Sequence, residues 1–245
     1  MNIWGWHAVL GLLNTKPNSV KQVCIAHSRR PDARYHEVAA VATQYHIPLV
    51  YRDRIELDEK CGLDHQGIMA ELQEAAAVTP YQESNYQDLI ENSLSDALIL
   101  LLDGVQDPHN LGACLRSAAA ANVRCVIAPK DKSVGITPVV RKVACGAAEI
   151  VPFITVTNLS RTMKELRELG VWIYGFDGEA KTSVYDAGFK GPVALAMGAE
   201  DRGLRRLTQE NCDVLVKIPM PGKMESLNVS VATGIALFEV CRQRR

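Results

Sequence analysis

Several features that would point to metal binding, secretion or membrane insertion are missing from this 245-residue sequence. Its seven cysteines include no C-x-x-C pair, which argues against a zinc site and against a disulfide framework. No apolar run approaches the length of a membrane span, and the N-terminus has no signal-peptide pattern. We therefore expect a soluble cytoplasmic protein with no bound metal and no membrane contact.

The two common nucleotide-binding signatures are missing as well. Neither G-x-G-x-x-G nor a P-loop sequence occurs, so a nucleotide-like ligand would have to be bound by another route. The formal charge of −1 gives no overall attraction to nucleic acid. Such contacts would have to come from local basic clusters, each of which is explained equally well as solvated surface. The clusters are Ser28-Arg-Arg30 with Arg34, Arg52-Asp-Arg54 and Arg242-Gln-Arg-Arg245.

What the chain does have is enough apolar sequence for a sizeable core. With 47% hydrophobic residues, it can form one core together with a small companion domain. Residues 1–76 alternate helical and strand patterns, residues 77–96 turn polar and suit a linker, and residues 97–245 are strongly periodic. In the first two parts we expect helices at 6–14, 32–45 and 86–92 and strands at 20–26, 48–51 and 67–72.

Strands and helices alternate from residue 97 onward. This order implies an α/β domain in which helices cover both faces of a mostly parallel sheet. In such a sheet, ligands are usually bound beyond the carboxyl ends of the strands. The expected strands are 97–103, 123–128, 149–154, 171–176, 192–197 and 213–218, and the expected helices are 110–121, 137–146, 158–169, 202–209 and 227–242.

Three stretches of this part place polar side chains at strand ends and helix starts. The first, Asp103-Gly-Val-Gln-Asp-Pro-His-Asn-Leu-Gly-Ala-Cys-Leu-Arg-Ser117, joins a buried apolar run to a helix rich in small residues. The second is Ala194-Leu-Ala-Met-Gly-Ala-Glu-Asp-Arg-Gly-Leu204. The third is Ile218-Pro-Met-Pro-Gly-Lys-Met-Glu-Ser-Leu-Asn-Val-Ser-Val-Ala232. Three such stretches in one domain are far more specific than any one of them.

In this order and spacing, the stretches resemble the three motifs of the SpoU/TrmH family of RNA ribose 2′-O-methyltransferases, which belongs to the SPOUT superfamily. Gly5-Trp-His-Ala-Val9, Asp58-Glu-Lys60 and His65-Gln-Gly-Ile68 resemble the small α/β, ribosomal-protein-like substrate-binding domain of the subgroup that acts on 23S rRNA guanosines. The resemblance implies a SPOUT-type parallel-sheet domain with a trefoil knot, S-adenosyl-L-methionine bound by the knotted loops, and a homodimer. The implied activity is 2′-O-methylation of a guanosine ribose in bacterial 23S rRNA.

The resemblance makes Asn110 and Arg116 catalytic residues of the first motif. Arg116 suits phosphate binding, because a guanidinium donates paired charge-assisted hydrogen bonds to phosphate oxygens. The family role of general base is physically awkward for a side chain that stays protonated at neutral pH, so we favour a phosphate anchor and leave the base role open. The plain alternatives are a surface salt bridge for Arg116 and a helix N-cap for Asn110. Gly112 and the neighbouring alanines are better explained by close helix packing.

In the second motif, the resemblance makes Glu200 catalytic, with a role in ordering Asn110 or Ser226. The alternative is a glutamate that interacts favourably with a helix N-terminus. We expect Gly198 to let the backbone approach a ligand closely in a tight loop. Arg202, Arg205 and Arg206 form a basic ridge that suits backbone phosphates or, equally simply, a solvated helix face.

The third motif leads from a strand into the last helix, with Ser226 expected as its N-cap. The resemblance also assigns Ser226 and Asn228 to the catalytic site. It further implies that Gly198, Ile218 and Leu227 contact the cofactor, through backbone groups near the adenine.

Two other functions fit the same sequence. One is a tRNA ribose 2′-O-methyltransferase, although the full N-terminal domain favours rRNA. The other is a noncatalytic rRNA-binding or ribosome-assembly protein on the same scaffold. The complete set of catalytic candidates argues against the second, because a protein that only binds RNA does not need it.

Overall fold

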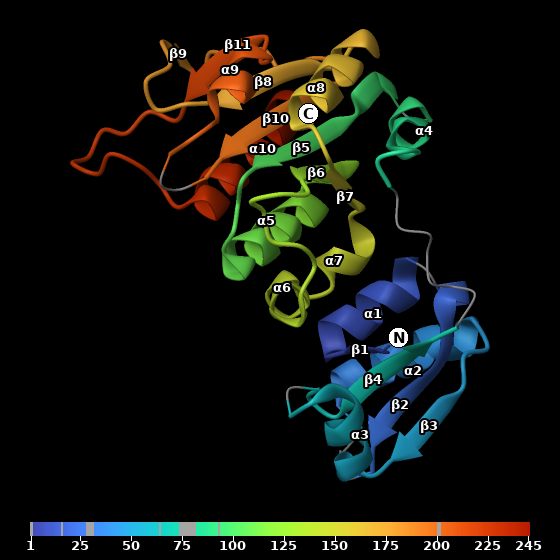
Figure 1. Cartoon of the computed structure of the whole chain (residues 1–245). Coiled ribbons are helices and arrows are strands. Elements are labelled where there is room, and N and C mark those ends of the chain that lie inside the picture. Colours follow the sequence, from blue (N-terminus) through green and yellow to red (C-terminus); the bar gives the residue numbers. More distant parts are fainter. Residues whose placement is uncertain are drawn as a thin grey trace. The chain divides into compact units, whose positions relative to one another are not determined.

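The computed structural model describes residues 2–15, 17–27, 32–63, 65–73, 82–92, 94–199 and 202–245. The chain divides into two units, shown in Figure 1 with colours that follow the sequence. One unit comprises residues 1–80 together with 145–150, and the other comprises 81–144 and 151–245.

The first unit contains a mixed sheet in the order β1-β4-β2-β3. β4 is antiparallel to both of its neighbours, whereas β2 and β3 are parallel. Apolar residues of α1 and α2 pack on one face of the sheet, and Leu57 of α3 packs on the other. The elements are β1 (Asn2–Trp4), α1 (Trp6–Thr15), the 3-10 turn η1 (Pro17–Ser19), β2 (Val20–Ala26), α2 (Ala33–Gln44), β3 (Leu49–Arg52), α3 (Arg54–Cys61) and β4 (Ile68–Leu72).

The helices and strands expected for this unit are confirmed, and β1, η1 and α3 were not predicted. Asp32 is the N-cap of α2, because its Oδ1 accepts the N–H of Tyr35 at 2.9 Å. The unpredicted β1 has only three residues. The unpredicted α3 is mostly charged and buries only Leu57, so it lacks a clear apolar period.

His65, in the turn between α3 and β4, is fully buried. Its Nδ1 accepts the N–H of Gly67 at 2.9 Å, so the proton lies on Nε2, 2.7 Å from Oδ1 of Asp58. These two bonds tie the start of β4 to α3. The residues from Asp58 to Ile68 that carry part of the family resemblance therefore have a structural task in this unit.

The second unit is built on a seven-stranded sheet in the order β7-β6-β5-β10-β8-β11-β9, in which all neighbouring strands are parallel. Successive strands β5, β6 and β7 run toward one edge, and the remaining strands lie on the other side of β5. The strand order therefore reverses between β5 and β10, where open α/β sheets usually bind ligands. The strands are β5 (Leu98–Asp103), β6 (Cys125–Pro129), β7 (Phe153–Val156), β8 (Trp172–Phe176), β9 (Thr182–Ser183), β10 (Val193–Gly198) and β11 (Val214–Lys217).

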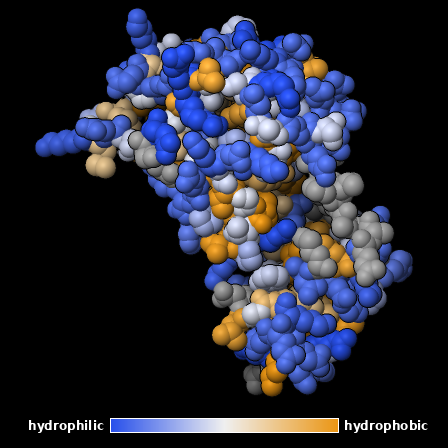
Figure 2. Space-filling model, in the orientation of Figure 1, coloured by the Kyte–Doolittle hydropathy of each residue, from blue (hydrophilic) through white to orange (hydrophobic). Residues whose placement is uncertain are grey.

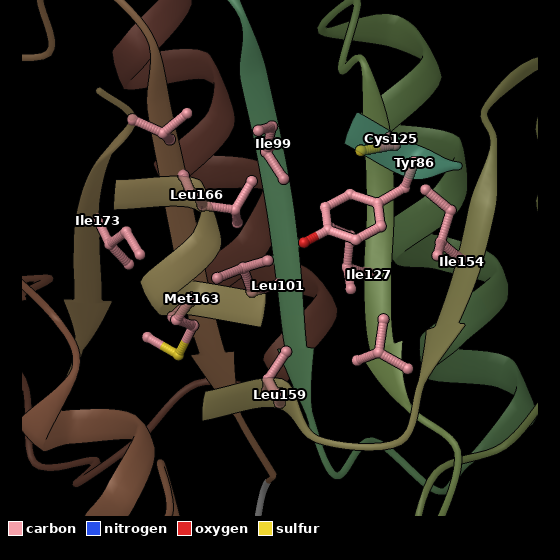
Figure 3. Close-up of a cluster of buried hydrophobic side chains, with 14 of the residues drawn as sticks. Tyr86, Ile99, Leu101, Cys125, Ile127, Ile154, Leu159, Met163, Leu166 and Ile173 are labelled. Atoms are coloured by element: carbon pink, nitrogen blue, oxygen red, sulfur yellow. The ribbon is translucent and has the colours of Figure 1, made fainter. Parts of the chain in front are cut away.

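Helices cover both faces of this sheet. On one face, Tyr86 of α4 and Leu159, Met163 and Leu166 of α8 pack against strand residues such as Ile99 (Figure 3). On the other face, α10 packs against α5 and β10. The helices of this unit are α4 (Tyr86–Glu91), α5 (Pro108–Ala120), α6 (Pro138–Ala144), α8 (Leu159–Glu168), α9 (Arg206–Glu210) and α10 (Val229–Gln243), with a 3-10 turn η3 (Leu94–Asp96), whereas α7 (Ala147–Ile150) belongs to the first unit. The α/β class with a parallel sheet is confirmed, and the knot stays a prediction.

Two predictions around residue 150 are wrong. The strand expected at 149–154 begins only at Phe153, and residues 147–150 form α7. The helix expected at 137–146 ends at Ala144, because Cys145 and Gly146 adopt φ angles of 51° and 92°. Such positive φ angles cannot continue a right-handed helix.

Two helix starts in the last third of the chain also differ from prediction. The helix expected at 202–209 begins at Arg206, because Gly203 turns back to form a bridge with Ala199. The helix expected at 227–242 begins at Val229. The two-residue strand β9 was not predicted.

The surface of the second unit that Figure 2 shows is mostly hydrophilic, with small separate apolar areas. Among the helices of the described part of the chain, none is long and apolar enough to cross a membrane.

Candidate active site

The carboxyl ends of β5, β10, β8 and β11 lie side by side at one edge of the second sheet. The last residues of β8, β10 and β11 and the loop between β11 and α10 line a cavity of about 300 Å³. This loop extends away from the sheet before the chain enters α10 (Figure 1). The cavity therefore lies at the kind of strand edge where the α/β pattern placed the site.

Residues of the second and third motifs meet in this cavity. Gly198, Ile218 and Leu227, the three residues expected to contact a cofactor, all line it. Ser226, expected in the catalytic set, lines it as well. The fold thus brings together side chains that lie up to 29 residues apart in the sequence. Their roles stay predictions.

Position 198 requires glycine for a reason besides the expected approach to a ligand, which stays a prediction. A Cβ atom there would lie 2.0 Å from the carbonyl carbon of Gly203 and 2.2 Å from the nitrogen of Leu204. The close approach that requires glycine is therefore to the protein's own backbone. Gly198 lets Gly203 and Leu204, in the loop after β10, pack directly against the end of β10.

The same loop is fixed by an ion pair that the sequence did not reveal. The buried Asp103, at the end of β5, accepts the backbone N–H of Arg205 at 2.9 Å and its Nε–H at 2.6 Å. The guanidinium Nη2 also contacts the same carboxylate. Arg205 is therefore committed to Asp103, and its assignment to a phosphate-binding ridge on a helix is wrong. Arg206, whose side chain is 85% exposed, pairs with Glu210.

A hydrogen bond joins the first motif to the third. Nδ2 of Asn228 donates to Oδ1 of Asn110 at 2.9 Å. Asn228 is the N-cap of α10, because its Oδ1 accepts the N–H of Ser230 at 2.9 Å and the Ser230 hydroxyl at 2.6 Å. Leu227 and Val229, on either side of Asn228, line the cavity, whereas Asn110 and Asn228 are not among its described lining residues.

Two expected helix caps are wrong. Asn110 is the third residue of α5, and the N-cap is Asp107, whose Oδ1 accepts the N–H of His109 at 2.9 Å. Pro108 takes the first helical position, which favours a start there. Ser226 is exposed and lies two residues before the true cap, Asn228. Neither Asn110 nor Ser226 is therefore the N-cap of its helix.

Arg116 lies on α5 with its side chain exposed. Six residues after Asn110, it is about 120° away around the helix. Arg116 is not among the described residues that line the cavity. Gly112, by contrast, packs as expected, since a Cβ there would meet Cβ of Val143 on α6 at 2.7 Å.

Other predicted residues divide into those outside the described part and those with structural partners. Glu200 and the segment Ser28–Arg30 lie outside the described residues. In the basic tail, Arg242 donates to Glu239 at 2.8 Å, and Arg244 donates to the backbone oxygens of Asp96 and Gly191 at 2.7 and 2.5 Å. Burial lowers the pKa of Arg244. These two arginines are therefore bound within the unit.

Several cavity residues were missed by sequence reasoning, among them Phe176, Asp177 and Glu179. Asp177 directly follows β8, just as Asp103 ends β5, so a carboxylate at a strand end was the available signal. Oδ2 of Asp177 accepts Nε2 of Gln209 at 2.7 Å, and Oδ1 accepts the N–H of Glu179 at 2.9 Å. Among the described residues, no group of three or more His, Cys, Asp and Glu side chains is placed to hold a metal ion.

Comparisons with known proteins agree with this geometry. Residues 97–238 match the model of the SpoU rRNA Methylase family, and residues 2–78 match the model for RNA 2′-O ribose methyltransferase substrate binding. The chain is 50% identical to the 23S rRNA (guanosine-2′-O-)-methyltransferase RlmB of Pseudomonas aeruginosa, with 99% of this chain and 96% of the relative covered. It is 49% identical to the protein of the same name from Coxiella burnetii, with the same coverage.

Among solved structures, the chain resembles the SpoU methyltransferase AviRb of Streptomyces viridochromogenes, which was solved in complex with AdoMet. The TM-score is 0.77 at 21% identity, with 100% of this chain and 90% of that chain covered. This likeness extends to the fold of the whole chain.

Proposed function

The chain belongs to the SpoU rRNA methylase family, and from this premise we propose that it transfers the methyl group of S-adenosyl-L-methionine to the 2′-oxygen of a guanosine ribose in bacterial 23S rRNA. Two relatives that carry this activity in their names are 50% and 49% identical over nearly the full length of both chains. One observation carries the proposal. A single cavity collects residues of the second and third motifs, and the Asn110–Asn228 bond joins the first motif to the third.

The cavity suits S-adenosyl-L-methionine in size and in chemistry. Its volume of about 300 Å³ lies at the lower end of the usual range for small-molecule sites. Met197, Ile218 and Leu227 offer apolar surface to an adenine ring, and the carboxylates of Asp177 and Glu179 attract positively charged groups. When bound, the cofactor supplies a methyl group activated by its sulfonium charge.

We assign the two asparagines to holding the ribose. Asn228 is fixed on both sides, because its amide donates to Asn110 while its oxygen accepts from Ser230. This bond in turn orients the Asn110 amide, whose Nδ2 is a donor suited to a ribose or phosphate oxygen. Orienting two reactants in line is worth several kcal/mol, roughly 7–11 in the best intramolecular cases.

We assign Arg116 to the RNA phosphate next to the target ribose. A guanidinium stays protonated at neutral pH, so it neutralises the phosphate and stabilises negative charge that develops on the 2′-oxygen. Transfer would break the bond between the sulfonium sulfur and the methyl carbon as the 2′-oxygen bonds to that carbon, would leave the thioether S-adenosyl-L-homocysteine, and would release the hydroxyl proton to solvent water. Ser226, exposed at the cavity, and Glu200, outside the described residues, complete the proposed catalytic set by ordering the substrate side.

We assign residues 1–76 to binding the RNA substrate, residues 77–96 to a linker and residues 97–245 to methyl transfer; within the linker range, α4 packs on the sheet of the second unit. The match of residues 2–78 to a substrate-binding family model supports this division. We place the reaction in the cytoplasm, where bacterial ribosomal RNA is made.

We also propose that the protein works as a homodimer through α10. Val231 and Phe238 are 50% and 51% exposed and lie seven residues apart, on the same side of the helix. A second copy of the chain would cover this apolar stripe. Sedimentation of the parent and of Phe238→Asp tests this: a dimer that the substitution dissociates supports the stripe, and a parent monomer at micromolar concentration contradicts it.

Transfer of labelled methyl groups to purified RNA tests the proposed function. The parent protein should label 23S rRNA from cells that lack the gene more than the same RNA from cells that have it. Transfer to tRNA but not to rRNA would instead support the tRNA enzyme. No transfer to either, with S-adenosyl-L-methionine still bound, would support a noncatalytic binding protein.

A further inference from the structure

Three aromatic side chains lie close together on the surface of the first unit. None of them has a role in the proposed methyl transfer. His27 follows β2, Tyr51 lies in β3 and Tyr35 lies in the first turn of α2. The rings of His27 and Tyr51 are stacked, with centroids 5.8 Å apart and an interplanar angle of 26°. The hydroxyls of Tyr35 and Tyr51 lie 2.5 Å apart. His27 is exposed, and Tyr51 is 46% exposed.

The backbone and the hydroxyl pair hold these rings in place. The N–H of His27 donates to the carbonyl of Arg52 at 3.0 Å, which ties the residue after β2 to the end of β3. The hydrogen bond with Tyr35 raises the pKa of Tyr51, so the Tyr51 ring stays neutral. Two adjacent flat rings are therefore presented to solvent in a fixed orientation, which lowers the entropy cost of binding a further ring.

Arginines lie next to these rings in the chain. Arg34 precedes Tyr35, and its side chain is 55% exposed, 3.6 Å from Asp32. Arg52 follows Tyr51 and lies 3.5 Å from Glu56, and Arg54 is exposed. Exposed ion pairs of this kind contribute little to stability, so these guanidiniums can exchange their carboxylate partners for phosphates at small cost.

We propose that His27 and Tyr51 form a stacking surface for an unpaired base of the RNA substrate, with Arg34 and Arg54 beside it for the adjoining phosphates. This assignment rests on the proposed function. It identifies an unpaired base as the part of the RNA that the first unit binds. Base-specific contacts with RNA usually go to single-stranded loops, whose bases stack on aromatic side chains. A duplex keeps its bases stacked inside and offers none to these rings.

Tyr51→Ala removes the larger ring and tests the assignment. Tyr45→Ala is the matched control, because Tyr45 is a second tyrosine of this unit, is 41% exposed and lies at the C-terminal end of α2. Affinity would be measured by fluorescence anisotropy on an rRNA hairpin with an unpaired loop and on a fully paired duplex of the same length. Loss of one stacked base typically weakens binding by about 5- to 150-fold. We expect such a loss for Tyr51→Ala on the hairpin alone and no loss for Tyr45→Ala.

A second readout reports the stacking itself. 2-Aminopurine at loop positions of the hairpin should lose fluorescence on binding the parent protein, and this loss should persist with Tyr51→Phe and disappear with Tyr51→Ala. Unchanged hairpin affinity and unchanged quenching with a folded Tyr51→Ala protein overturn the assignment, and so does an equal loss on the duplex. Methyl transfer by the parent separates the two proposals: if the parent methylates rRNA and Tyr51→Ala binds it equally well, only the stacking surface fails.

Discussion

Arg205 reaches the buried carboxylate of Asp103 with both its backbone N–H and its guanidinium. The two residues are 102 positions apart, at the end of β5 and in the loop after β10. The strand order of the second sheet reverses between these two strands. This ion pair therefore holds Arg205, in the loop after β10, at the place in the sheet where open α/β folds usually bind ligands.

Replacing Arg205 with alanine should destabilise the second unit and weaken cofactor binding. The substitution leaves a buried carboxylate without its cation, and the loss of a charged hydrogen bond of this kind costs about 2–3 kcal/mol, given that Arg205 itself is partly exposed. Urea unfolding and calorimetry with S-adenosyl-L-methionine measure the two effects. Arg206→Ala is the matched control, expected to cost less than about 0.5 kcal/mol. Equal behaviour of the two variants would contradict the role given to Asp103.

Gly198→Ala should be among the most damaging single substitutions at the cavity. Its methyl group would lie 2.0 Å from the carbonyl carbon of Gly203, and backbone atoms cannot move away as a flexible side chain can. We expect a loss of at least about 3 kcal/mol in the free energy of unfolding. Gly222→Ala is the control, because nothing lies within 4 Å of an added Cβ there. A stable Gly198→Ala protein would show that the loop folds differently.

Glu83 should contribute to a loss of stability of the second unit in acid. The Thr157 hydroxyl and N–H, followed by Arg161, lower the pKa of Glu83 from its usual value near 4.5. Oε2 of Glu83 accepts from the hydroxyl at 2.8 Å and from the N–H at 3.1 Å. Because the pKa is lower in the folded state, this contribution is complete above the unfolded value and disappears as the pH falls through the folded one.

Glu83→Gln should therefore reduce the acid-dependent loss of stability relative to the parent, and Thr157→Val should reduce it in part. Urea unfolding at a series of pH values from about 7 down to about 3.5 measures this slope. Parallel slopes for the parent and both variants would show that the folded and unfolded states bind protons equally at Glu83.

Arg116→Ala should abolish methyl transfer while the affinity for S-adenosyl-L-methionine stays unchanged, because Arg116 does not line the cavity. Calorimetry and a transfer assay separate the two effects. Loss of cofactor affinity as well would contradict the assignment of Arg116 to phosphate.

Arg116→Lys distinguishes an anchor from a base. A lysine anchor keeps part of the activity with the pH dependence of the parent. A new ionisation at neutral to mildly alkaline pH would favour the base role, because an ammonium loses its proton far more readily than a guanidinium.

The alternation of apolar strands and amphipathic helices was enough to predict the architecture of the second unit. Apart from β9, the strands of its sheet are short and mainly apolar runs, and helices cover both faces of the sheet, so periodicity locates these strands well. Periodicity fails where one residue decides the backbone path. Cys145 and Gly146 end α6 with positive φ angles, and Gly203 turns the chain back to Ala199 where a helix was expected.

Of the residues predicted for the site, Gly198, Ile218, Ser226 and Leu227 line the cavity, their roles stay predictions, and the local geometry was not predicted. Capping rules placed Asn110 and Ser226 at helix starts, yet Asp107 and Asn228 hold those positions, because several capping residues compete in each segment. Ion pairs such as Asp103–Arg205 join residues that only the folded sheet brings together, so no local pattern reveals them. The sequence alone did not predict which residues at the ends of distant strands contact one another.

The most direct test identifies the methylated nucleoside. Undermodified 23S rRNA would be incubated with the protein and S-adenosyl-L-methionine, digested to nucleosides and separated by mass spectrometry. We predict that 2′-O-methylguanosine accumulates to at most one per rRNA molecule and that Arg116→Ala yields none. A methyl group found on a base, or on the ribose of a nucleoside other than guanosine, would contradict the account.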